Sequence, residues 1–485
     1  MSRLARAAWL TLALLSLFTI GAGAAVAHLL PGRLALWRLP TVALRPLAAG
    51  VQVLSPAAGP APGAAAAVPA GSAATPAGVA AALAAGLRPA VLGADRGAAV
   101  TDLSTGKVLF SQAGSALFAP ASTAKLAVAV AALDALGPGA RLQTSVVADR
   151  KPSAIVLVGG GDPTLAAGPP PAADYPQPAT LASLAAATAA RLRAAHVRQV
   201  RLSYDTSLYA GPGMAPGWKP AYVSTGNVTP IQALEVDQGR LTPGGAPQDA
   251  DDPRNLRPRT LTPAADAARA FAGFLAREGI RVAGPVSQAA AAPGSRALAK
   301  VSSPPVAEIV QWMLMESNNV IAENLARQVA IATGAQASFS GAAAAELKVL
   351  RQAGVASGIS LVDGSGLSPD DRIAPDALVR IIQLAAAGSP QLRPAITGLP
   401  VAGFAGTLAP GGSVFGPTGN AGLGVVRAKT GNLSTVAALA GVVYASNGQL
   451  LGFAFMADRL PAKGLAAAGA DMASLATALA GCGCH

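Results

Sequence analysis

The alternation of hydrophobic and polar residues near the end of the chain predicts three consecutive strands. Residues of the two kinds alternate with the period of two that marks a strand over three segments, 424–433, 436–444 and 449–456. The last two segments are joined by Ser446-Asn447-Gly448, and an Asn-Gly pair between strands is typical of a tight hairpin turn. A helix is expected to follow, from about residue 462 to residue 479.

A second group of elements is predicted near residue 100. The segment 100–110 is interpreted as two strands around a turn at residues 104–107, with a short helix before it at 79–87. A longer helix is expected over residues 122–136, ending at Gly137-Pro138. Because strands and a helix occur at both ends of this body, we expect one sheet built from both ends, with the middle of the chain inserted. The predicted fold class is α+β.

The first 30 residues have the pattern of an export signal. Arg3 and Arg6 precede an uncharged, mostly apolar run over residues 7–27, which ends in small residues. A run of about 20 such residues is also long enough to span a bilayer. A cleaved signal peptide and a retained membrane anchor therefore both fit. Either one predicts an exported protein, at the extracytoplasmic face of the membrane, in the cell wall or in the periplasm.

Composition divides the rest of the chain into a linker and a folded body. Residues 31–78 are rich in Ala, Pro and Gly and offer little to bury, which is typical of a flexible linker. The expected catalytic domain has two parts, residues 79–140 and residues 301–480. An inserted domain is expected between them, at residues 141–300, and a short tail follows at residues 481–485.

The charge of the chain does not indicate a nucleic-acid partner. The 485 residues carry a formal net charge of +12, yet only 12% of them are charged, against about 25% in a usual protein. The basic residues are scattered and have no aromatic residues between them. We interpret them as a generally cationic surface, which outside the cell suits anionic wall polymers or lipid headgroups.

The histidines and cysteines exclude several catalytic chemistries. Of three histidines only His196 lies inside the body, in an Arg-rich stretch typical of a solvated helix. A Ser-His-Asp triad and a zinc site of several His or Cys ligands are therefore not expected. No Gly-Lys-Ser/Thr follows the glycines at 159–161, which we interpret as a turn at a strand end. Cys482 and Cys484 are only two positions apart in the sequence, so a disulfide between them would not connect distant parts of the fold. We expect neither a metal ion nor a cofactor.

A serine and a lysine at the start of the helix at 122–136 could form a nucleophile and its base. Ser122 and Lys125 are three residues apart, so they lie on the same helical face. A serine hydroxyl is a weak nucleophile until a neighbouring base takes its proton. The helix N-terminus also offers free backbone N–H groups for a developing oxyanion. Alone, however, this pair is also typical of an N-cap serine with a surface lysine.

Two further motifs fit the same chemistry. In Ser317-Asn318-Asn319, the serine and the last asparagine would point to different faces of a continuous helix, so a turn is needed to aim both into one cleft. Lys429-Thr430-Gly431 lies in a predicted strand, where it would supply a cation, a hydroxyl and a position without a side chain against which a substrate backbone can lie. Each motif is common by itself.

In this order the three motifs resemble the signature set of penicillin-binding proteins and serine β-lactamases. The 192 positions from Lys125 to Ser317 are too many for a compact β-lactamase. The chain is similar to the class C low-molecular-mass penicillin-binding proteins, the D-alanyl-D-alanine carboxypeptidase/endopeptidase family. The resemblance covers about residues 80–480 and includes five further strings, at 157–165, 317–325, 363–368, 406–408 and 427–431. It implies a catalytic domain with an antiparallel sheet flanked by helices, split by an inserted, mainly β domain.

The chain departs from the family pattern in three places. Asn318 stands where Asp is common, a near-isosteric change that we expect to be tolerated. Asn432 follows the Lys-Thr-Gly motif where Thr or Ser is usual, and its backbone N–H would still serve an oxyanion. The insert is also shorter than in relatives with two extra domains, so we expect one inserted domain.

The resemblance implies acyl transfer from a D-alanyl-D-alanine bond. Ser122 would attack the penultimate carbonyl with Lys125 as its general base, and the backbone N–H groups of Ser122 and Asn432 would hold the oxyanion. Ser317 would pass a proton to the leaving amine, and Asn319 would bind the substrate amide.

The third motif would bind the end of the substrate. Lys429 would lower the pKa of the Lys125 amine and attract the terminal carboxylate, Thr430 would bind that carboxylate, and Gly431 would leave room for the substrate backbone.

The implied partners are peptidoglycan stem peptides and, as covalent inhibitors, β-lactam antibiotics. Nucleic acid is not expected as a partner. The balance between carboxypeptidase and endopeptidase activity is open. Two alternatives also remain, a β-lactamase-like hydrolase and a catalytically idle wall-binding scaffold of the same fold.

Overall fold

A computed structural model describes residues 73–87, 89–148, 153–172, 175–241, 257–410, 414–415, 420–461 and 464–484. The predicted signal peptide or anchor at 1–30 lies outside the described residues, and so does the linker up to residue 72. None of the helices described in these ranges is both long and apolar enough to cross a membrane.

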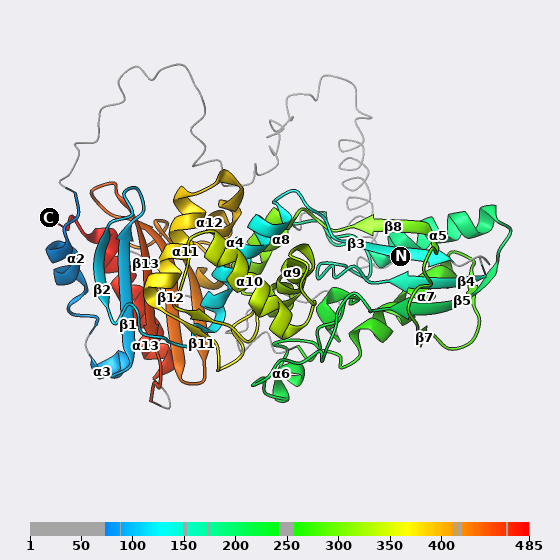
Figure 1. Cartoon of the computed structure of the whole chain (residues 1–485), viewed down its shortest axis with the longest axis horizontal. Coiled ribbons are helices and arrows are strands. Elements are labelled where there is room, and N and C mark those ends of the chain that lie inside the picture. The colour runs from blue at the N-terminus through cyan, green and yellow to red at the C-terminus, as the bar shows by residue number, and fades with distance from the viewer. Residues whose placement is uncertain are drawn as a thin grey trace, which may run out of the picture. The chain divides into compact units, whose positions relative to one another are not determined.

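Both ends of the described chain build one antiparallel sheet, as the sequence predicts (Figure 1). Its strand order is β11-β12-β13-β1-β2. The sheet consists of β1 Arg96–Asp102, β2 Val108–Gln112, β11 Val426–Leu433, β12 Val436–Tyr444 and β13 Leu450–Ala457. The predicted hairpin at residues 446–448 joins β12 to β13, and Gly448 takes the positive φ of 84° that its turn requires.

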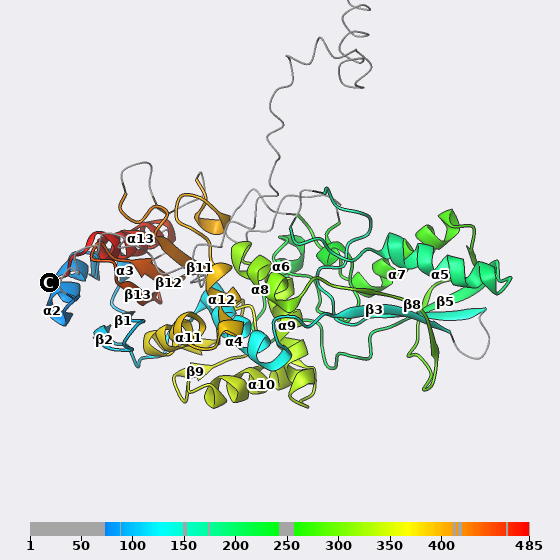
Figure 2. The ribbon, with the colours of Figure 1, turned by 90° about the horizontal axis from the view of Figure 1, so that it is seen from above.

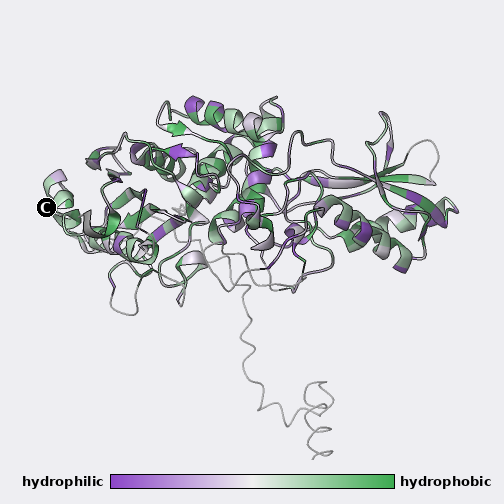
Figure 3. Cartoon of the chain, turned by 90° about the horizontal axis from the view of Figure 1, so that it is seen from below, coloured by the Kyte–Doolittle hydropathy of each residue, from purple (hydrophilic) through white to green (hydrophobic). Residues whose placement is uncertain are grey.

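Helices cover both faces of this catalytic sheet because its strands are apolar on both faces. Successive residues of β12 alternate between two cores, Ala438 and Ala440 in one, Ala437 and Leu439 in the other. Figure 3 shows long apolar stretches in the strands and in the helices around them. The first core is formed with α4 Lys125–Leu136, α8 Val306–Met315, α9 Asn319–Ala332, α10 Phe339–Gln352, α11 Pro375–Ala387 and α12 Pro394–Thr397, and the second with α2 Pro76–Leu83, α3 Pro89–Leu92 and α13 Leu465–Gly481.

The middle of the chain forms a second sheet with its own core. Its order is β6-β5-β4-β3-β8, with β7 also paired to β5. The strands are β3 Gln143–Ala148, β4 Ala154–Val158, β5 Gln199–Asp205, β6 Arg281–Val282, β7 Ser287–Gln288 and β8 Arg296–Ser302. Two helices, α5 Leu181–Ala194 and α7 Pro263–Arg277, pack on one side of this sheet (Figure 2).

These two helices make the insert richer in helix than the mainly β domain expected from the sequence. Both are rich in alanine, which has the highest intrinsic helix propensity. His196 is exposed just after the end of α5, which confirms that it is solvated. The predicted domain limits, 141–300 for the insert, stay a prediction.

One segment leaves the second sheet and packs on the catalytic body. It contains α6 Ala221–Ser224 and a 3-10 turn at Asp237–Gly239. Trp218 and Ile231 from this segment share a small core with Val320 of α9 and Phe339 of α10. The remaining short elements are the ribbon of β9 Ile359–Ser360 and β10 Arg372–Ile373, and the 3-10 turns η3 Ala121–Ala124, η6 Pro390–Leu392 and η7 Gly406–Leu408.

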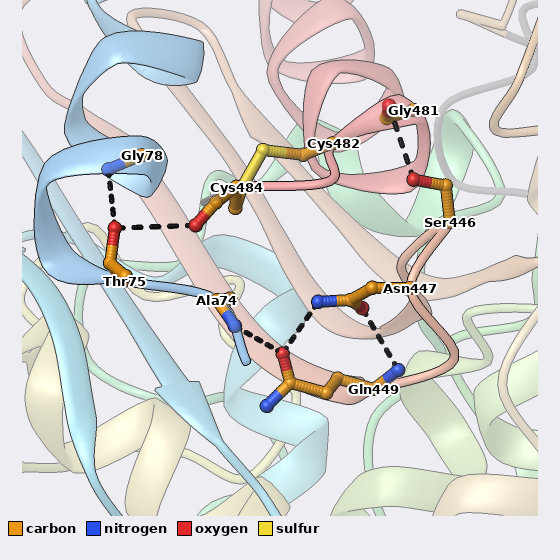
Figure 4. The surroundings of a disulfide bond; sticks show 9 residues. All are labelled: Ala74, Thr75, Gly78, Ser446, Asn447, Gln449, Gly481, Cys482 and Cys484. Carbon is orange, nitrogen blue, oxygen red and sulfur yellow. Dashed lines mark hydrogen bonds between the residues drawn. A yellow bond between two sulfur atoms is a disulfide. The ribbon is translucent and has the colours of Figure 1, made fainter. Parts of the chain in front are cut away.

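The two cysteines form a disulfide with each other (Figure 4). The bond closes only the tight loop between Cys482 and Cys484, so it does not join distant parts of the fold, as their spacing predicts. The backbone oxygen of Cys484 accepts a hydrogen bond of 2.7 Å from the N–H of Thr75. The tail is therefore attached to the start of α2.

Candidate active site

Ser122 lies in the 3-10 turn η3, directly before α4. The preceding residue, Ala121, has a φ of 45°, which is an uncommon conformation for a residue with a side chain. Gly366 packs closely on this turn, because a Cβ at Gly366 would lie 1.9 Å from the oxygen of Ala121. The conformation that presents Ser122 is therefore held in place by a neighbouring loop.

Lys125 brings together three of the predicted site residues. Its side chain is fully buried, and its Nζ donates hydrogen bonds to Ser122 Oγ at 2.9 Å and to Asn319 Oδ1 at 2.7 Å. A third bond of 2.7 Å goes to the carbonyl oxygen of Ser365. The distance from Nζ to Oγ is within the range for direct proton transfer. The Ser-x-x-Lys motif and the second motif thus meet at one point.

The second motif forms a turn between two helices, as predicted, and not a continuous helix. α8 ends at Met315 and α9 begins at Asn319, while Ser317 has a φ of 53°. Asn318 caps α9, because its side chain accepts a bond of 3.0 Å from the N–H of Ile321. Ser317 is 1% exposed, and its hydroxyl has no hydrogen-bond partner among the described residues.

The Lys-Thr-Gly motif lies on a strand, as predicted, and this strand, β11, forms an edge of the catalytic sheet. Lys429 is fully buried and donates a bond of 2.8 Å to the oxygen of Thr430. Gly431 faces Ser122. A Cβ at this position would lie 2.6 Å from the oxygen of Pro120 and 3.2 Å from the nitrogen of Ser122. Only glycine allows β11 to approach η3 this closely.

An open pocket extends from Ser122 and Asn432. Its wall comes from four parts of the chain and consists of Ser122, Lys219, Tyr222, Asn227, Gly366, Leu367, Asn432, Leu433 and Ser434. Lys219, Tyr222 and Asn227 were not predicted as site residues. A signal was nevertheless present, because a Trp, a Lys and a Tyr occur within five positions, 218–222, in a chain with only 4% aromatic residues.

Two buried carboxylates hold the loop at residues 363–368. Asp363 accepts hydrogen bonds from the N–H groups of Gly366 at 2.6 Å and Ser368 at 2.7 Å. Glu323 of α9 accepts from the N–H of Ser365 at 2.8 Å. The carbonyl oxygen of Ser365, in this loop, accepts the hydrogen bond of 2.7 Å from Lys125 Nζ. Neither carboxylate was predicted as a site residue.

Burial raises the pKa of Glu323 to about 8, with a further contribution from the charge of Asp363. Burial also raises the pKa values of Glu346 and Asp371, and nearby acidic groups add to this in both cases. The region around Asp363 and Glu323 therefore favours protonated carboxyl groups.

Comparisons with known proteins agree with this geometry. The D-Ala-D-Ala carboxypeptidase 3 (S13) family matches residues 79–257 and 242–479. Carboxypeptidase DacB of Mycolicibacterium smegmatis is 38% identical over 407 residues, which are 83% of this chain and 84% of that protein. The D-alanyl-D-alanine carboxypeptidase of an Actinomadura species is 29% identical over 433 residues, which are 75% of this chain and 77% of the relative.

The fold is also found in a solved structure. Penicillin-binding protein 4 (dacB) of Haemophilus influenzae aligns with a TM-score of 0.63 at 22% identity, over 78% of this chain and 95% of that one. The α+β class and the resemblance predicted from the motifs are therefore confirmed, as is the enzyme class, a serine-type D-Ala-D-Ala carboxypeptidase. The chain belongs to the D-Ala-D-Ala carboxypeptidase 3 (S13) family.

Proposed function

We propose that this enzyme releases the terminal D-alanine of peptidoglycan stem peptides through an acyl-enzyme on Ser122. The observation that carries the proposal is the buried Lys125 amine, 2.9 Å from Ser122 Oγ and 2.7 Å from Asn319 Oδ1. A buried lysine in contact with a serine at a pocket wall provides a nucleophile and a base without histidine.

In the acylation step Ser122 Oγ attacks the carbonyl carbon of the penultimate D-alanine, and its proton passes to Lys125 Nζ. The backbone N–H groups of Ser122 and Asn432, which both line the pocket, stabilise the oxyanion. When the intermediate collapses, the peptide bond breaks. Ser317, whose buried hydroxyl lacks a partner among the described residues, then gives its hydroxyl proton to the leaving amine and takes the proton that Lys125 holds, so that both side chains return to their starting forms.

Binding of the substrate uses the groups beside this centre. Asn319 holds the amide of the substrate, and Thr430 binds the terminal carboxylate with the positive charge of Lys429 behind it. Thr430 Oγ1 already lies 3.3 Å from Thr407 Oγ1, so the hydroxyl is held in place. Water then hydrolyses the ester and frees the enzyme.

A β-lactam resembles the acyl donor and would acylate the same serine, and slow hydrolysis of that ester would make it an inhibitor. Since peptidoglycan lies outside the cytoplasmic membrane, the substrate also agrees with the export signal proposed for residues 1–30. The proposed reaction is the same whether that segment is cleaved or retained. Only the attachment of the protein to the membrane differs.

The test uses the purified full chain in detergent, a fluorescent penicillin and a diacyl-D-Ala-D-Ala peptide. We expect covalent labelling and release of D-alanine from wild-type protein, and neither from Ser122→Ala or Lys125→Met. Ser474→Ala, an exposed serine of α13, is the matched control and should behave as wild type.

Three results would contradict the proposal. A folded wild-type protein without labelling and without release would indicate the idle scaffold. Rapid turnover of penicillin without D-alanine release would indicate a β-lactamase. Labelling that persists in folded Ser122→Ala would show that another residue is the nucleophile.

A further inference from the structure

Two consecutive residues of the insert have backbone conformations that are uncommon for residues with side chains. In the 3-10 turn at Asp237–Gly239, Asp237 has a φ of 50° and Gln238 has a φ of 56°. Such conformations persist only where the surroundings impose them, and they are concentrated at functional sites. The side chain of Gln238 is polar and yet only 2% exposed. The function proposed above gives this turn no role.

The side chain of Gln238 contacts the turn that carries the second motif. Its Oε1 accepts a hydrogen bond of 2.8 Å from Asn318 Nδ2. Asn318 is 1% exposed, and its Oδ1 accepts the bond of 3.0 Å from the N–H of Ile321 that caps α9. The residue between Ser317 and Asn319 is therefore held at both ends of its side-chain amide, by α9 and by the insert.

A second hydrogen bond joins the insert to the same motif. Asn319 Nδ2 donates a bond of 3.0 Å to the backbone oxygen of Asn227, while its Oδ1 accepts the bond from Lys125 Nζ. The insert thus contacts both asparagines of the motif. Of these two contacts, the one from Gln238 is made by a side chain, so a substitution can remove it.

Contacts within the insert hold Gln238 in its unusual conformation. Its backbone oxygen accepts a hydrogen bond from Nη1 of Arg259, which is 3% exposed. The backbone oxygen of the next residue, Gly239, accepts a bond of 2.8 Å from the N–H of Thr260. The insert therefore presents the Gln238 amide to the second motif from a supported turn.

We propose that Gln238 is a positioning residue, which fixes the turn carrying Ser317 and Asn319 and so makes acylation depend on the insert. Without its amide, Asn318 Nδ2 loses the hydrogen bond that it makes to the insert, and the turn is free to shift. A shift of the turn displaces both Ser317 and the Asn319 side chain that contacts Lys125. The inference rests on the proposed function, because it takes the roles of Ser317 and Asn319 from it.

The amide of Gln238 is suited to an asparagine or an aspartate at position 318. Its oxygen accepts from Asn318, and in Asn318→Asp the amide can turn by 180° and donate from Nε2, with little change of shape. This rotation breaks no other bond of Nε2, because that atom has no hydrogen-bond partner among the described residues. An ionised carboxylate in Gln238→Glu can only accept, so it suits Asn318 alone.

The test measures the rate of acylation by fluorescent penicillin in the full chain and its variants. Gln238→Met keeps the length of the side chain and removes the amide. We expect acylation up to about a hundredfold slower, the cost of a shift of about 1 Å at a reacting centre. Gln238→Glu and Asn318→Asp should each keep most of the wild-type rate. Combined, they set two acceptors against each other and should slow acylation as Gln238→Met does.

The combined variant distinguishes positioning from a general loss of stability. Each of its two changes is tolerated alone, so its slow acylation would come from the contact between the two side chains. It also decides the question if Gln238→Met does not fold.

Gln232→Met is the matched control. Gln232 lies in the same segment of the insert, and its Oε1 accepts a hydrogen bond of 3.2 Å from the N–H of Ala264 in α7. The same substitution here removes a bond within the insert, so the melting temperature should fall and acylation should stay at the wild-type rate.

Labelling of the wild-type protein separates the two proposals. If it is labelled and folded Gln238→Met is acylated equally fast, this inference is overturned and the proposed function stands. Fast acylation of the combined variant, or slow acylation of folded Gln232→Met, also overturns the inference alone. A folded wild-type protein without labelling overturns the proposed function, and this inference with it.

Discussion

Single residues in unusual backbone conformations lie beside the groups proposed to act in catalysis. Ala121 precedes the nucleophile, Ser317 precedes the turn into α9, and both have φ values near +50° although they carry side chains. Such a conformation costs on the order of 1 kcal/mol or more and persists only where the surroundings impose it. Gly366, packed on Ala121, is part of those surroundings.

Gly431→Ala is predicted to abolish most of the activity without unfolding the protein. The added Cβ would meet the oxygen of Pro120 and the nitrogen of Ser122, so β11 must move away from η3. A shift of about 1 Å at a reacting centre costs about a hundredfold in rate. Acylation by fluorescent penicillin and the melting temperature measure the two effects.

The matched control is Gly273→Ala in α7. A Cβ there meets no atom within 4 Å, so acylation should be unchanged. Full acylation by a folded Gly431→Ala protein would show that the close approach of β11 does not matter.

The sequence predicts individual site residues when they lie in a local motif. The Ser122 and Lys125 pair is fixed by helical spacing, and Gly431 is marked by its neighbours in the strand. Lys219 lies in no catalytic motif. The aromatic residues around it draw attention to residues 218–222, but its place beside Ser122 depends on how this segment returns from the insert to pack on α9. Contacts between segments that are far apart in the sequence cannot be predicted from residue spacing or from hydrophobic periodicity.

At the scale of elements, α9 connects the catalytic centre to the insert. It is buried along most of its length and carries polar side chains with partners on both sides. Asn324 donates a bond of 3.1 Å to Glu235 of the insert, and Gln328 donates one of 3.1 Å to the oxygen of Gly160. On the other side Glu323 holds the loop that contacts Lys125. The orientation of α9 thus fixes Asn319 relative to both parts.

Asn318→Ala is predicted to reduce both stability and acylation. The substitution removes the cap of α9 and the bond of 2.8 Å from Nδ2 to Gln238 Oε1. Loss of an N-cap costs about 1–2 kcal/mol. Because the cap begins one residue before Asn319, its loss should also displace that side chain. Denaturant unfolding and the acylation rate test this, and Asn318→Asp should retain the cap.

The substitution Ser338→Ala separates the loss of stability from the displacement of Asn319. Ser338 caps α10, where its side chain accepts a bond from the N–H of Gly341. Its loss should lower stability by a similar amount and leave acylation unchanged. Equal acylation in the two folded variants would rule out a role of the cap in aiming Asn319.

The elements of the catalytic sheet were predictable, and those of the insert were less so. The strands β11–β13 alternate clearly and end in a hairpin sequence, so local pattern was sufficient. The helices α5 and α7 consist largely of alanine, and in a chain rich in alanine throughout such segments do not stand out from linkers and loops. Their helical state depends on the sheet on which they pack.

At the scale of the whole molecule, burial determines the pKa values of several carboxyl groups among the described residues and favours their protonated form. Burial raises the pKa of Asp162 to about 6 and that of Glu323 to about 8, and it raises those of Glu235, Glu346 and Asp371 as well. Each of these groups binds a proton more tightly in the folded chain than in the unfolded chain. At a pH above the pKa values that these groups have in the unfolded chain, folding is therefore accompanied by the binding of protons.

The free energy of unfolding is predicted to fall as the pH rises from 5 to 8. For Glu323 the window runs from its usual value of 4.5 to about 8. Within it the folded state holds a proton that the unfolded state has lost, so each pH unit removes up to about 1.4 kcal/mol. Glu323→Gln cannot titrate and should have a shallower slope of stability against pH.

Denaturant unfolding at several pH values measures that slope. Asp370→Asn, which removes an exposed carboxylate from the surface, is the control and should keep the slope of wild type. A wild-type protein that becomes more stable between pH 5 and pH 8 would contradict the prediction.

The pairing of β1 with β13 has a consequence for the order in which the enzyme is made. Arg96 pairs with Ala457, which is 361 positions later in the chain. Ser122 and Lys125 are synthesised long before the strand that completes their site, and pairing over such a distance is slow. A growing chain therefore carries its nucleophile without the Lys-Thr-Gly strand, and it stays inactive toward peptide bonds until synthesis is nearly finished.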